Sequence, residues 1–200
     1  MQTQKKYNWA ANIYDLYEAP IEKLLFSKLR NIAIKAATGK VLEIGIGTGK
    51  NLPYYPPEVE LVGIDFSRGM LSKAQKQLDH INISKVELIE ADIQDTDFDS
   101  GFFDAIVSSC VFCTVPDPQK GLNEAFRLLK PGGKAIFIEH MKSEHFYVNI
   151  FLYMMNFMSS IFLGTSMIRE TQKNIENAGF KIQDVKYYVS DVVRIIIAVK

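Results

Sequence analysis

Seven short apolar runs recur along the chain from residue 40 onward, most of them separated by stretches with helical spacing. The first five are mostly apolar on both faces, as in strands that helices cover on two sides, and the intervening lengths suit crossover helices. We therefore predict a doubly wound α/β sheet of parallel strands, in the Rossmann-like manner. These five runs are residues 40–46, 59–65, 85–92, 102–109 and 133–141.

The last two apolar runs, 180–188 and 194–200, are separated by only a few residues. Such a short connection cannot cross over to a parallel neighbour, so we predict an antiparallel C-terminal hairpin at the edge of a seven-stranded sheet. We expect a single domain over 1–200, because 200 residues can bury one substantial core. Its expected parts are N-terminal cap helices (1–38), a cofactor-binding core (40–141), an apolar substrate cap (143–168), and a C-terminal helix with the hairpin (169–200).

The charge balance narrows the range of partners. Lys and Arg together number 23, as do Asp and Glu, so no global field would draw the protein to nucleic acid or to an anionic membrane. The N-terminal stretch is polar and aromatic rather than a cleavable apolar leader, which predicts a cytoplasmic location.

Three alternate glycines, Gly45, Gly47 and Gly49, follow the first predicted strand. Glycine there lets the backbone turn tightly and approach a ligand that a Cβ would block. The dinucleotide fingerprint requires a glycine where Lys50 stands, and the lysine-bearing phosphate loop requires Ser or Thr where Asn51 stands. Neither phosphate motif is therefore satisfied.

Carboxylates stand at or near the ends of the first three predicted strands. Glu43 precedes the first glycine, Asp65 closes the second strand and Asp92 closes the third. At a strand end, Asp65 can accept both ribose hydroxyls of a nucleoside, and Asp92 can accept from an adenine amino group. This pattern indicates an adenosine without pyrophosphate. S-adenosylmethionine fits it, because acidic groups favour its ammonium and sulfonium charges and the glycine-turn amides can bind its carboxylate.

The two cysteines, Cys110 and Cys113, have the spacing of a redox dithiol or of half a zinc site. A zinc site needs two more ligands, and His80, His140 and His145 show no paired metal spacing. We therefore favour two reduced thiols packed at a strand end and predict no metal.

The segments "LEIGIGTGKN", "GIDFSRGML", "EADIQDTDFDSGFFDAIVSS" and "LLKPGGK" resemble, in this order, the motifs of class I S-adenosylmethionine-dependent methyltransferases. The similarity covers residues 40 to 140 and implies S-adenosylmethionine as the cofactor. It places the methionine moiety by the glycine loop and Ser108, the ribose by Asp65, and the adenine by the residues that follow the second and third strands. The cofactor-binding residues so implied are Glu43, Gly45, Gly47, Gly49, Asp65, Phe66, Met70, Asp92, Ile93 and Ser108.

A finer resemblance is to the branch of bacterial phosphatidylethanolamine N-methyltransferases, quinone-biosynthesis methyltransferases and animal thiol methyltransferases. "CVFCTVPDP", "KPGGKAIFIEHM", "RETQKNIENAGF" and "RIIIAVK" have counterparts there. The resemblance implies methyl transfer to a small or lipid-like acceptor, such as a phospholipid headgroup amine or a similar nitrogen or sulfur nucleophile. The animal enzymes carry an N-terminal membrane anchor that is not seen in this sequence, so stable membrane attachment is not expected.

Two features outside the core could serve the acceptor. Tyr14, in the aromatic leader, and His140, at the end of the fifth strand, are candidate catalytic groups for proton removal or orientation. Residues 146–168 carry no charge and could form a helix with a narrow polar stripe and a wide apolar arc. This arc could line a substrate cavity, touch a membrane surface peripherally, or pair two copies in a homodimer.

Two other functions remain open at this point. A nicotinamide-dependent oxidoreductase is disfavoured by Lys50 at the missing glycine position, and a non-catalytic protein that binds the adenosyl cofactor would share every cofactor motif. A nucleic-acid methyltransferase is disfavoured, because "SSCVFC" stands where such enzymes carry an asparagine-proline-proline-aromatic motif.

Overall fold

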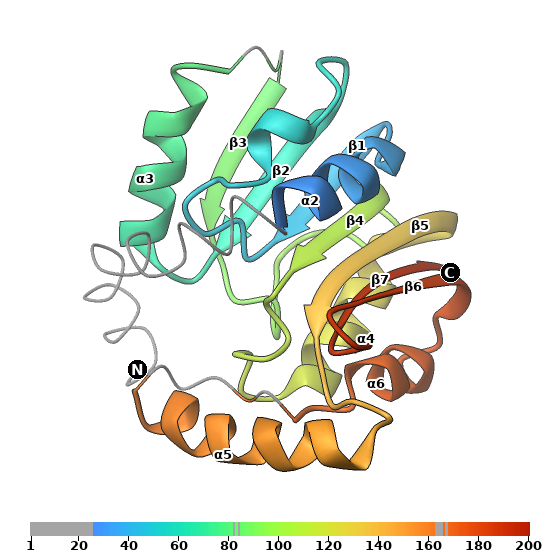
Figure 1. The fold of residues 1–200 in the computed structure, drawn as a ribbon. Coiled ribbons are helices and arrows are strands. Elements are labelled where there is room, and N and C mark those ends of the chain that lie inside the picture. The colour runs from blue at the N-terminus through green and yellow to red at the C-terminus, as the bar shows by residue number, and fades with distance from the viewer. Residues whose placement is uncertain (1–25, 82, 84, 163–165, 167) are drawn as a thin grey trace.

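The computed structural model describes residues 26–81, 83, 85–162, 166 and 168–200. Within them a seven-stranded sheet has the strand order β3-β2-β1-β4-β5-β7-β6 (Figure 1). The first five strands pair in parallel, and β7 runs antiparallel to both β5 and β6. The doubly wound sheet and the C-terminal edge hairpin are thus confirmed. The strands are β1 (Lys40–Ile44), β2 (Glu60–Asp65), β3 (Lys85–Glu90), β4 (Phe103–Ser109), β5 (Leu129–His140), β6 (Lys181–Tyr188) and β7 (Val193–Val199).

Helices cover both faces of the sheet. Residues of α2 and α3 pack in one hydrophobic cluster and residues of α4 and α6 in the other, on the opposite face. Helix α5 lies at the bottom of Figure 1, on the side towards which the parallel strands point. The α-helices are α2 (Ser27–Ala33), α3 (Arg68–Leu78), α4 (Pro118–Leu128), α5 (Phe146–Phe162) and α6 (Thr171–Asn177), with 3₁₀ turns at Ile34–Ala36 and Leu52–Tyr54.

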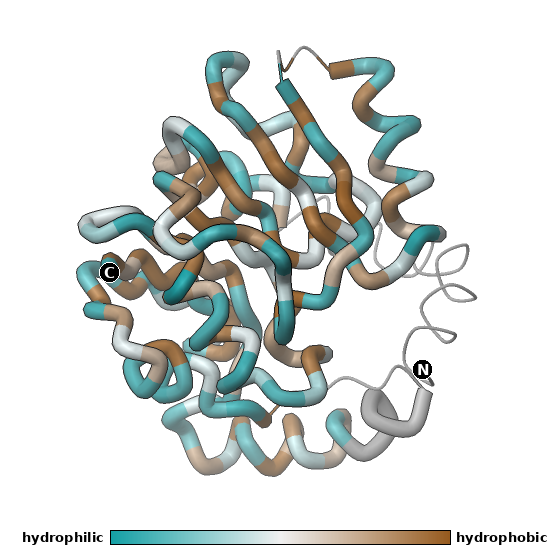
Figure 2. Tube along the Cα trace, turned by 180° about the vertical axis from the view of Figure 1, so that it is seen from behind, coloured by the Kyte–Doolittle hydropathy of each residue, from teal (hydrophilic) through white to brown (hydrophobic). Residues whose placement is uncertain are grey.

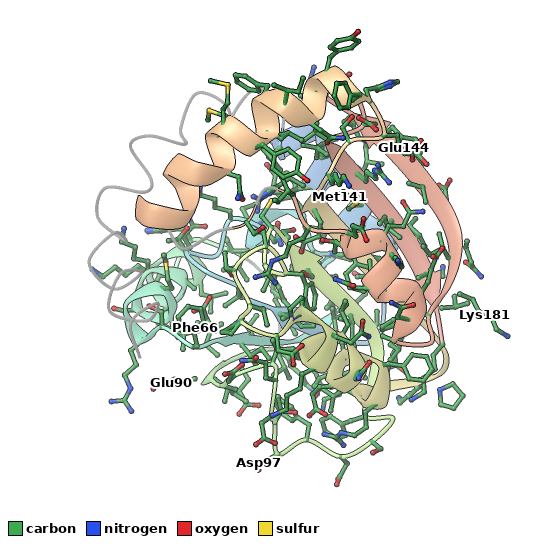
Figure 3. The ribbon with its side chains drawn as sticks, turned by 90° about the horizontal axis from the view of Figure 1, so that it is seen from below. Phe66, Glu90, Asp97, Met141, Glu144 and Lys181 are labelled. Carbon is green, nitrogen blue, oxygen red and sulfur yellow. The ribbon has the colours of Figure 1, made fainter. Side chains whose placement is uncertain are left out.

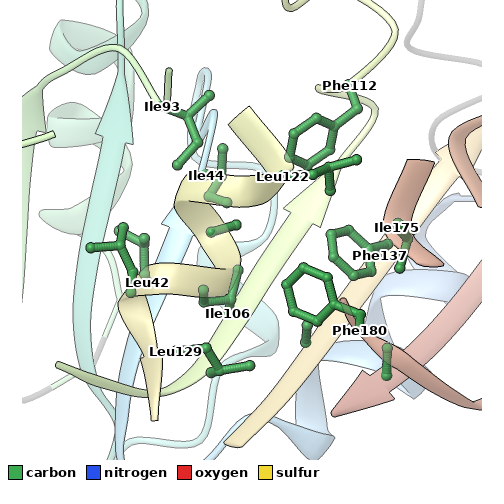
Figure 4. Packing of buried hydrophobic residues seen from close by; sticks show 14 of the residues in the cluster. Leu42, Ile44, Ile93, Ile106, Phe112, Leu122, Leu129, Phe137, Ile175 and Phe180 are labelled. Atoms are coloured by element: carbon green, nitrogen blue, oxygen red, sulfur yellow. The ribbon is translucent and has the colours of Figure 1, made fainter. Parts of the chain in front are cut away.

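The central strands form the core because they are apolar on both faces. Leu42 and Ile106 face α4 and are fully buried with Leu122 of that helix and Phe137 of β5 (Figure 4). Figure 2 shows the same concentration of hydrophobic residues along the central strands, with hydrophilic residues on the outer turns. Burial on both faces holds the strand ends in fixed positions relative to each other, and the site is built at those ends.

Two helices begin at side-chain caps that follow strands or loops of the core. The Ser67 hydroxyl accepts a hydrogen bond from the amide of Met70 at 3.3 Å, which starts α3 directly after β2. The Asp117 carboxylate accepts from the amide of Lys120 at 3.0 Å and starts α4. Each cap satisfies an amide that the first helical turn leaves unpaired. The short β2–α3 connection therefore stays at the carboxyl edge of the sheet.

Candidate cofactor site

The three alternate glycines form a turn of left-handed residues after β1. Gly45, Gly47 and Gly49 have φ angles of 62°, 57° and 84°, a region that side chains with a Cβ rarely adopt. A Cβ on Gly45 would lie 2.5 Å from a methyl carbon of Val111, so that glycine is needed for packing. Among the described residues, a Cβ on Gly47 would meet nothing closer than 3.9 Å. A Cβ on Gly49 would lie 2.6 Å from Leu52 Cδ1, so the turn has two closely packed glycines and one, Gly47, with space beside it.

Asp65, at the end of β2, binds this turn through its carboxylate. Its Oδ2 accepts from the amide of Gly47 at 3.0 Å, and its Oδ1 accepts from the amide of Ser67 at 2.9 Å. Burial raises the pKa of the carboxyl, and these two amide hydrogen bonds act in the opposite direction. Each carboxylate oxygen has a further lone pair, so Asp65 is oriented by the backbone while it can still accept hydrogen bonds from a ligand.

Glu43 lies beneath the glycine turn and is only 1% exposed. Its Oε1 accepts from Asn51 Nδ2 at 2.7 Å, and Asn51 also accepts from Arg30 Nη1 at 2.7 Å and donates to Ser109 Oγ at 3.1 Å. Burial raises the pKa of Glu43 to about 7, against the lowering effects of Tyr55, Asn51 and Arg30. The structure thus places Glu43 in a buried polar network that joins the turn to α2 and β4.

The residues expected around adenine come from two neighbouring connections. Met70, in the first turn of α3, and Ile93, which follows β3, are buried. Phe66 is half-buried directly after β2 (Figure 3). Asp92 is exposed, and its carboxylate accepts from the amide and the side-chain amide of Gln94 at 2.9 to 3.0 Å. The fold brings these residues to the edge that carries Asp65, and their contact with adenine stays a prediction.

The three remaining sequence candidates differ in placement. Ser108 is fully buried, and its hydroxyl donates to Glu139 Oε1 at 2.8 Å, so it faces the sheet interior and its contact with a cofactor remains a prediction. His140 is half-buried at the end of β5. Tyr14 lies outside the described residues. The catalytic roles of Tyr14 and His140 stay predictions.

Comparison with known proteins identifies the family. A methyltransferase-domain family model matches residues 42–137. A thiol S-methyltransferase (TMT1A) of Homo sapiens is 30% identical over 173 residues, which cover 84% of this chain and 70% of that protein. The chain belongs to the S-adenosylmethionine-dependent methyltransferases. Their methyl donor, S-adenosylmethionine, is its cofactor.

One further sequence similarity supports this methyltransferase family, and one structural similarity shows the shared fold. A phosphatidylethanolamine N-methyltransferase of Cereibacter sphaeroides is 34% identical over 128 residues, which cover 62% of this chain and 63% of that protein, just under two thirds of its length. The solved structure of an S-adenosylmethionine-dependent methyltransferase from Thermotoga maritima, described as a possible histamine N-methyltransferase, aligns with a TM-score of 0.75 and 20% identity. It covers 98% of this chain and 99% of the other and shows that the Rossmann-like fold is shared.

The geometry of this methyltransferase fits the cofactor. The open face of Gly47 leaves room where a Cβ would otherwise stand, and Asp65 keeps acceptor capacity beside it. The first leaves space for a ligand that lies against the backbone, and the second leaves acceptors for the hydroxyl groups of that ligand.

Several polar residues near the site escaped sequence reasoning. Asn51 entered only as the residue that rules out a phosphate loop, although it connects Glu43 to Arg30. Glu139 was overlooked beside His140, and it is fully buried with its pKa raised by burial to about 7. The available signal was a single acidic residue inside the otherwise apolar run "AIFIEHM", a position where a charge needs partners.

The cysteines of the methyltransferase are free thiols. Cys113 is buried, its Sγ donates to the carbonyl of Cys110 at 3.2 Å, and burial raises its pKa well above the usual value. Among the described residues, no three His, Cys, Asp or Glu side chains are grouped as metal ligands would be. A raised pKa keeps Cys113 protonated and unreactive at neutral pH.

Helix α5 turns a polar residue inward and apolar residues outward. Asn149 is bound to the backbone of Ser143 through both its amide nitrogen and its oxygen, at 2.8 and 3.0 Å. Leu152 is buried, whereas a group of aromatic, aliphatic and methionine side chains is 43% to 84% exposed. We call this group the α5 outer face; its members are Phe146, Tyr147, Ile150, Phe151, Tyr153, Met154 and Met155. In the part of the chain that the structure describes, no helix has the length and apolarity to cross a bilayer.

Proposed function

We propose that this protein transfers a methyl group from S-adenosylmethionine to a small or lipid-like acceptor with a nitrogen or sulfur nucleophile. The observation that carries the proposal is the carboxylate of Asp65, held by the amides of Gly47 and Ser67 against the open face of the glycine turn. This arrangement provides acceptors for ribose hydroxyls and free backbone beside them. The family relationship supplies the reaction type.

The bound donor would supply a methyl carbon already activated by its sulfonium. In-line displacement on such a carbon needs orientation and exclusion of water more than a strong base. Asp65 and the glycine turn would hold the nucleoside and methionine parts, while Phe66, Met70 and Ile93 would enclose the adenine ring. His140 at the end of β5 would orient the acceptor or take its proton.

The α5 outer face supports an acceptor with a lipid character. No residue from 146 to 162 is charged, and the helix lies on the side of the molecule to which the parallel strands point (Figures 1 and 3). An exposed apolar helix face of this kind suits peripheral contact with a membrane surface. The relatives that act on a phospholipid amine and a thiol, by their names, agree with an apolar acceptor. We place the protein in the cytoplasm, in peripheral contact with membrane.

Calorimetric titration with S-adenosylhomocysteine tests the cofactor site. We expect binding by the wild type, at least tenfold weaker binding by Asp65→Ala, and no effect of Asp97→Ala, an exposed aspartate outside the site. NAD serves as the control ligand. Binding of NAD without binding of S-adenosylhomocysteine would return the glycine turn to a dehydrogenase role.

Transfer is then tested by mass spectrometry of acceptor mixtures that contain phosphatidylethanolamine, alkyl thiols and quinone precursors. We expect one class to gain the mass of a methyl group when S-adenosylmethionine is present. Binding of the donor without any methylated product from these classes would favour a non-catalytic protein.

Vesicle co-sedimentation tests the role of α5. Phe151→Glu places a charge on the outer face, and Ile32→Glu is the matched control, because Ile32 is 53% exposed on α2. We expect only Phe151→Glu to reduce binding to phosphatidylethanolamine vesicles. If wild type and both variants bind equally, and Phe151→Glu instead converts a dimer to a monomer in light scattering, the face joins two copies.

A further inference from the structure

Residues 110–115 follow β4, and we call them the β4 loop. Polar side chains of neighbouring segments bind this loop through hydrogen bonds. It begins at Cys110, whose φ of 55° is rare for a residue with a Cβ. The Cys110 amide donates to the carbonyl of Ile138 at 2.8 Å, so the chain is still hydrogen-bonded to the neighbouring strand β5 at this point. A strained residue of this kind persists only where surrounding contacts fix it.

Glu139 of β5 binds the amide side of the β4 loop. Its Oε1 accepts from the amides of Val111 at 3.0 Å and Phe112 at 3.4 Å, and also from the Ser108 hydroxyl. Its Oε2 accepts no hydrogen bond from any described side chain or amide. A fully buried carboxylate that accepts from two amides of the loop, and from Ser108 near the end of the preceding strand, determines where that loop lies.

Arg169 binds the carbonyl side of the same loop. Its Nη1 donates to the carbonyls of Phe112 at 2.9 Å and Val115 at 2.7 Å. Ser166, which also follows α5, donates its amide to the carbonyl of Cys113 at 2.9 Å. The segment that follows α5 is therefore attached to the β4 loop by three hydrogen bonds.

The β4 loop in turn contacts the cofactor turn. The Val111 side chain fills the space beside Gly45, where a Cβ would come within 2.5 Å of its methyl carbon. Glu139 accepts a hydrogen bond from the amide of Val111, so the position of the Val111 side chain depends on the carboxylate of Glu139. A chain of direct contacts thus runs from the end of α5 through the β4 loop to Gly45.

We infer that Glu139 and Arg169 are positioning residues for methyl transfer. Together they fix the β4 loop between the glycine turn and the segment that follows α5. The inference rests on the proposed function for its role in catalysis, whereas the contacts that it describes exist without a ligand. Neither residue touches the reacting atoms in this assignment. Loss of the hydrogen bonds of either Glu139 or Arg169 would let Val111 move away from Gly45 and would make the glycine turn less well fixed.

Ionisation of Glu139 should make the contacts of the β4 loop depend on pH. Burial raises its pKa to about 7, the donors from Val111, Ser108 and Phe112 lower it, and so does the charge of Arg169. Cys113 also faces it, with a thiol kept protonated by burial. Arg194, its register partner on β7, directs its guanidinium to Gln172 and to the carbonyl of Asp191 instead. Glu139 should therefore change from neutral to charged between pH 6 and pH 8.

The first test is nuclear magnetic resonance of the unliganded protein, with Glu139→Gln compared with the wild type. Gln keeps an acceptor oxygen but does not ionise. In the wild type the amide signals of Val111 and Phe112 should titrate with a midpoint near pH 7, and in Glu139→Gln they should not. The Gly45 signal is compared between the two proteins at pH 8 only, because Glu43, two residues before it, also has a pKa raised to about 7. The exposed Glu58→Gln serves as the control and should titrate like the wild type.

The second test is affinity for S-adenosylhomocysteine. Hydrogen bonds to a charged acceptor are about twice as strong as neutral ones. Glu139→Gln should therefore bind about five- to tenfold more weakly than the wild type at pH 8 and within twofold of it at pH 6. Arg169→Lys, which keeps the charge but has a shorter side chain that does not reach the position of Nη1, should bind more weakly at both pH values. Turnover, once an acceptor is known, should follow the same pattern.

Two results would overturn the inference. One is a Gly45 amide signal that is the same in the folded Glu139→Gln variant as in the wild type at pH 8. The other is an unchanged affinity for S-adenosylhomocysteine in both variants. If the amide signals behave as expected but no ligand binds to the wild type, the proposed function fails while the positioning of the loop stands.

Discussion

At the scale of single residues, two glycines in one turn have different roles. A left-handed residue with a Cβ costs about 1–2 kcal/mol. Gly47→Ala should lower the free energy of unfolding by only this amount, because among the described residues its Cβ meets nothing closer than 3.9 Å. Gly45→Ala should lower it by more, because its Cβ collides with Val111. In contrast, Gly47→Ala should weaken S-adenosylhomocysteine binding more than tenfold. Urea unfolding and calorimetry measure the two effects, and an undiminished affinity of Gly47→Ala would show that the ligand does not lie over this glycine.

Glu43 gives a prediction about stability and pH. Burial raises its pKa in the folded protein from the ordinary value of 4.5 to about 7, so the folded state holds a proton that the unfolded state releases. The contribution of protonated Glu43 to the free energy of unfolding is therefore fully present below pH 4.5 and is lost as the pH rises through 7. The shift corresponds to about 3 kcal/mol. Relative to Glu43→Gln, the wild type should lose about that much unfolding free energy between pH 5 and pH 8.

Urea unfolding of both proteins at several pH values measures this difference. Glu58→Gln is the matched control, because Glu58 is exposed, and its difference from the wild type should not change with pH. A constant difference between the wild type and Glu43→Gln would mean that the carboxylate keeps the same charge over the whole range.

At the scale of elements, the sequence can indicate the helix caps but cannot indicate the side-chain contacts between strands. Ser67 and Asp117 each stand directly before a stretch with helical spacing in the sequence, and each caps its helix through an amide three residues away, so a local pattern is enough to indicate them. The contact of Ser108 with Glu139 joins residues 31 apart, and that of Asn51 with Ser109 joins residues 58 apart. Local patterns do not encode such distances, so the polar networks under the turn became visible only in the fold.

The α4 cap provides a prediction at this scale. Asp117→Ala removes the acceptor for the Lys120 amide and a negative charge at the helix N-terminus, which should cost about 1 kcal/mol of unfolding free energy. Asp79→Ala is the matched control, since Asp79 follows the last residue of α3, where a negative charge is unfavourable. It should leave stability unchanged or slightly higher. Equal losses in chemical denaturation would indicate a general effect of charge instead of a cap.

At the scale of the whole molecule, apolar periodicity was enough to predict the sheet. Runs apolar on both faces can only be buried between two helical layers, and the short link between the last two runs forces a hairpin, so topology followed from the chain order. The position of Asp65 followed as well, because the ends of parallel strands share one edge. The orientation of Ser108 towards Glu139 did not follow, since the spacing of residues along β4 does not show which polar partner lies across the strand.

The site and the global fold are coupled through mass action. A ligand that binds only the folded state at 100 times its Kd stabilises it by about 2.7 kcal/mol, and for a chain of this size each kcal/mol raises Tm by about 2–4 °C. S-adenosylhomocysteine should therefore raise the Tm of the wild type by about 5–10 °C at that concentration, and NAD should leave it unchanged. In Asp65→Ala the shift should fall to about half or less at the same ligand concentration, because tenfold weaker binding leaves about 1.4 kcal/mol of stabilisation. The Tm of unliganded Asp65→Ala serves as its own baseline, since the carboxylate also binds the amides of Gly47 and Ser67. A shift of equal size in both proteins would place the ligand away from β2.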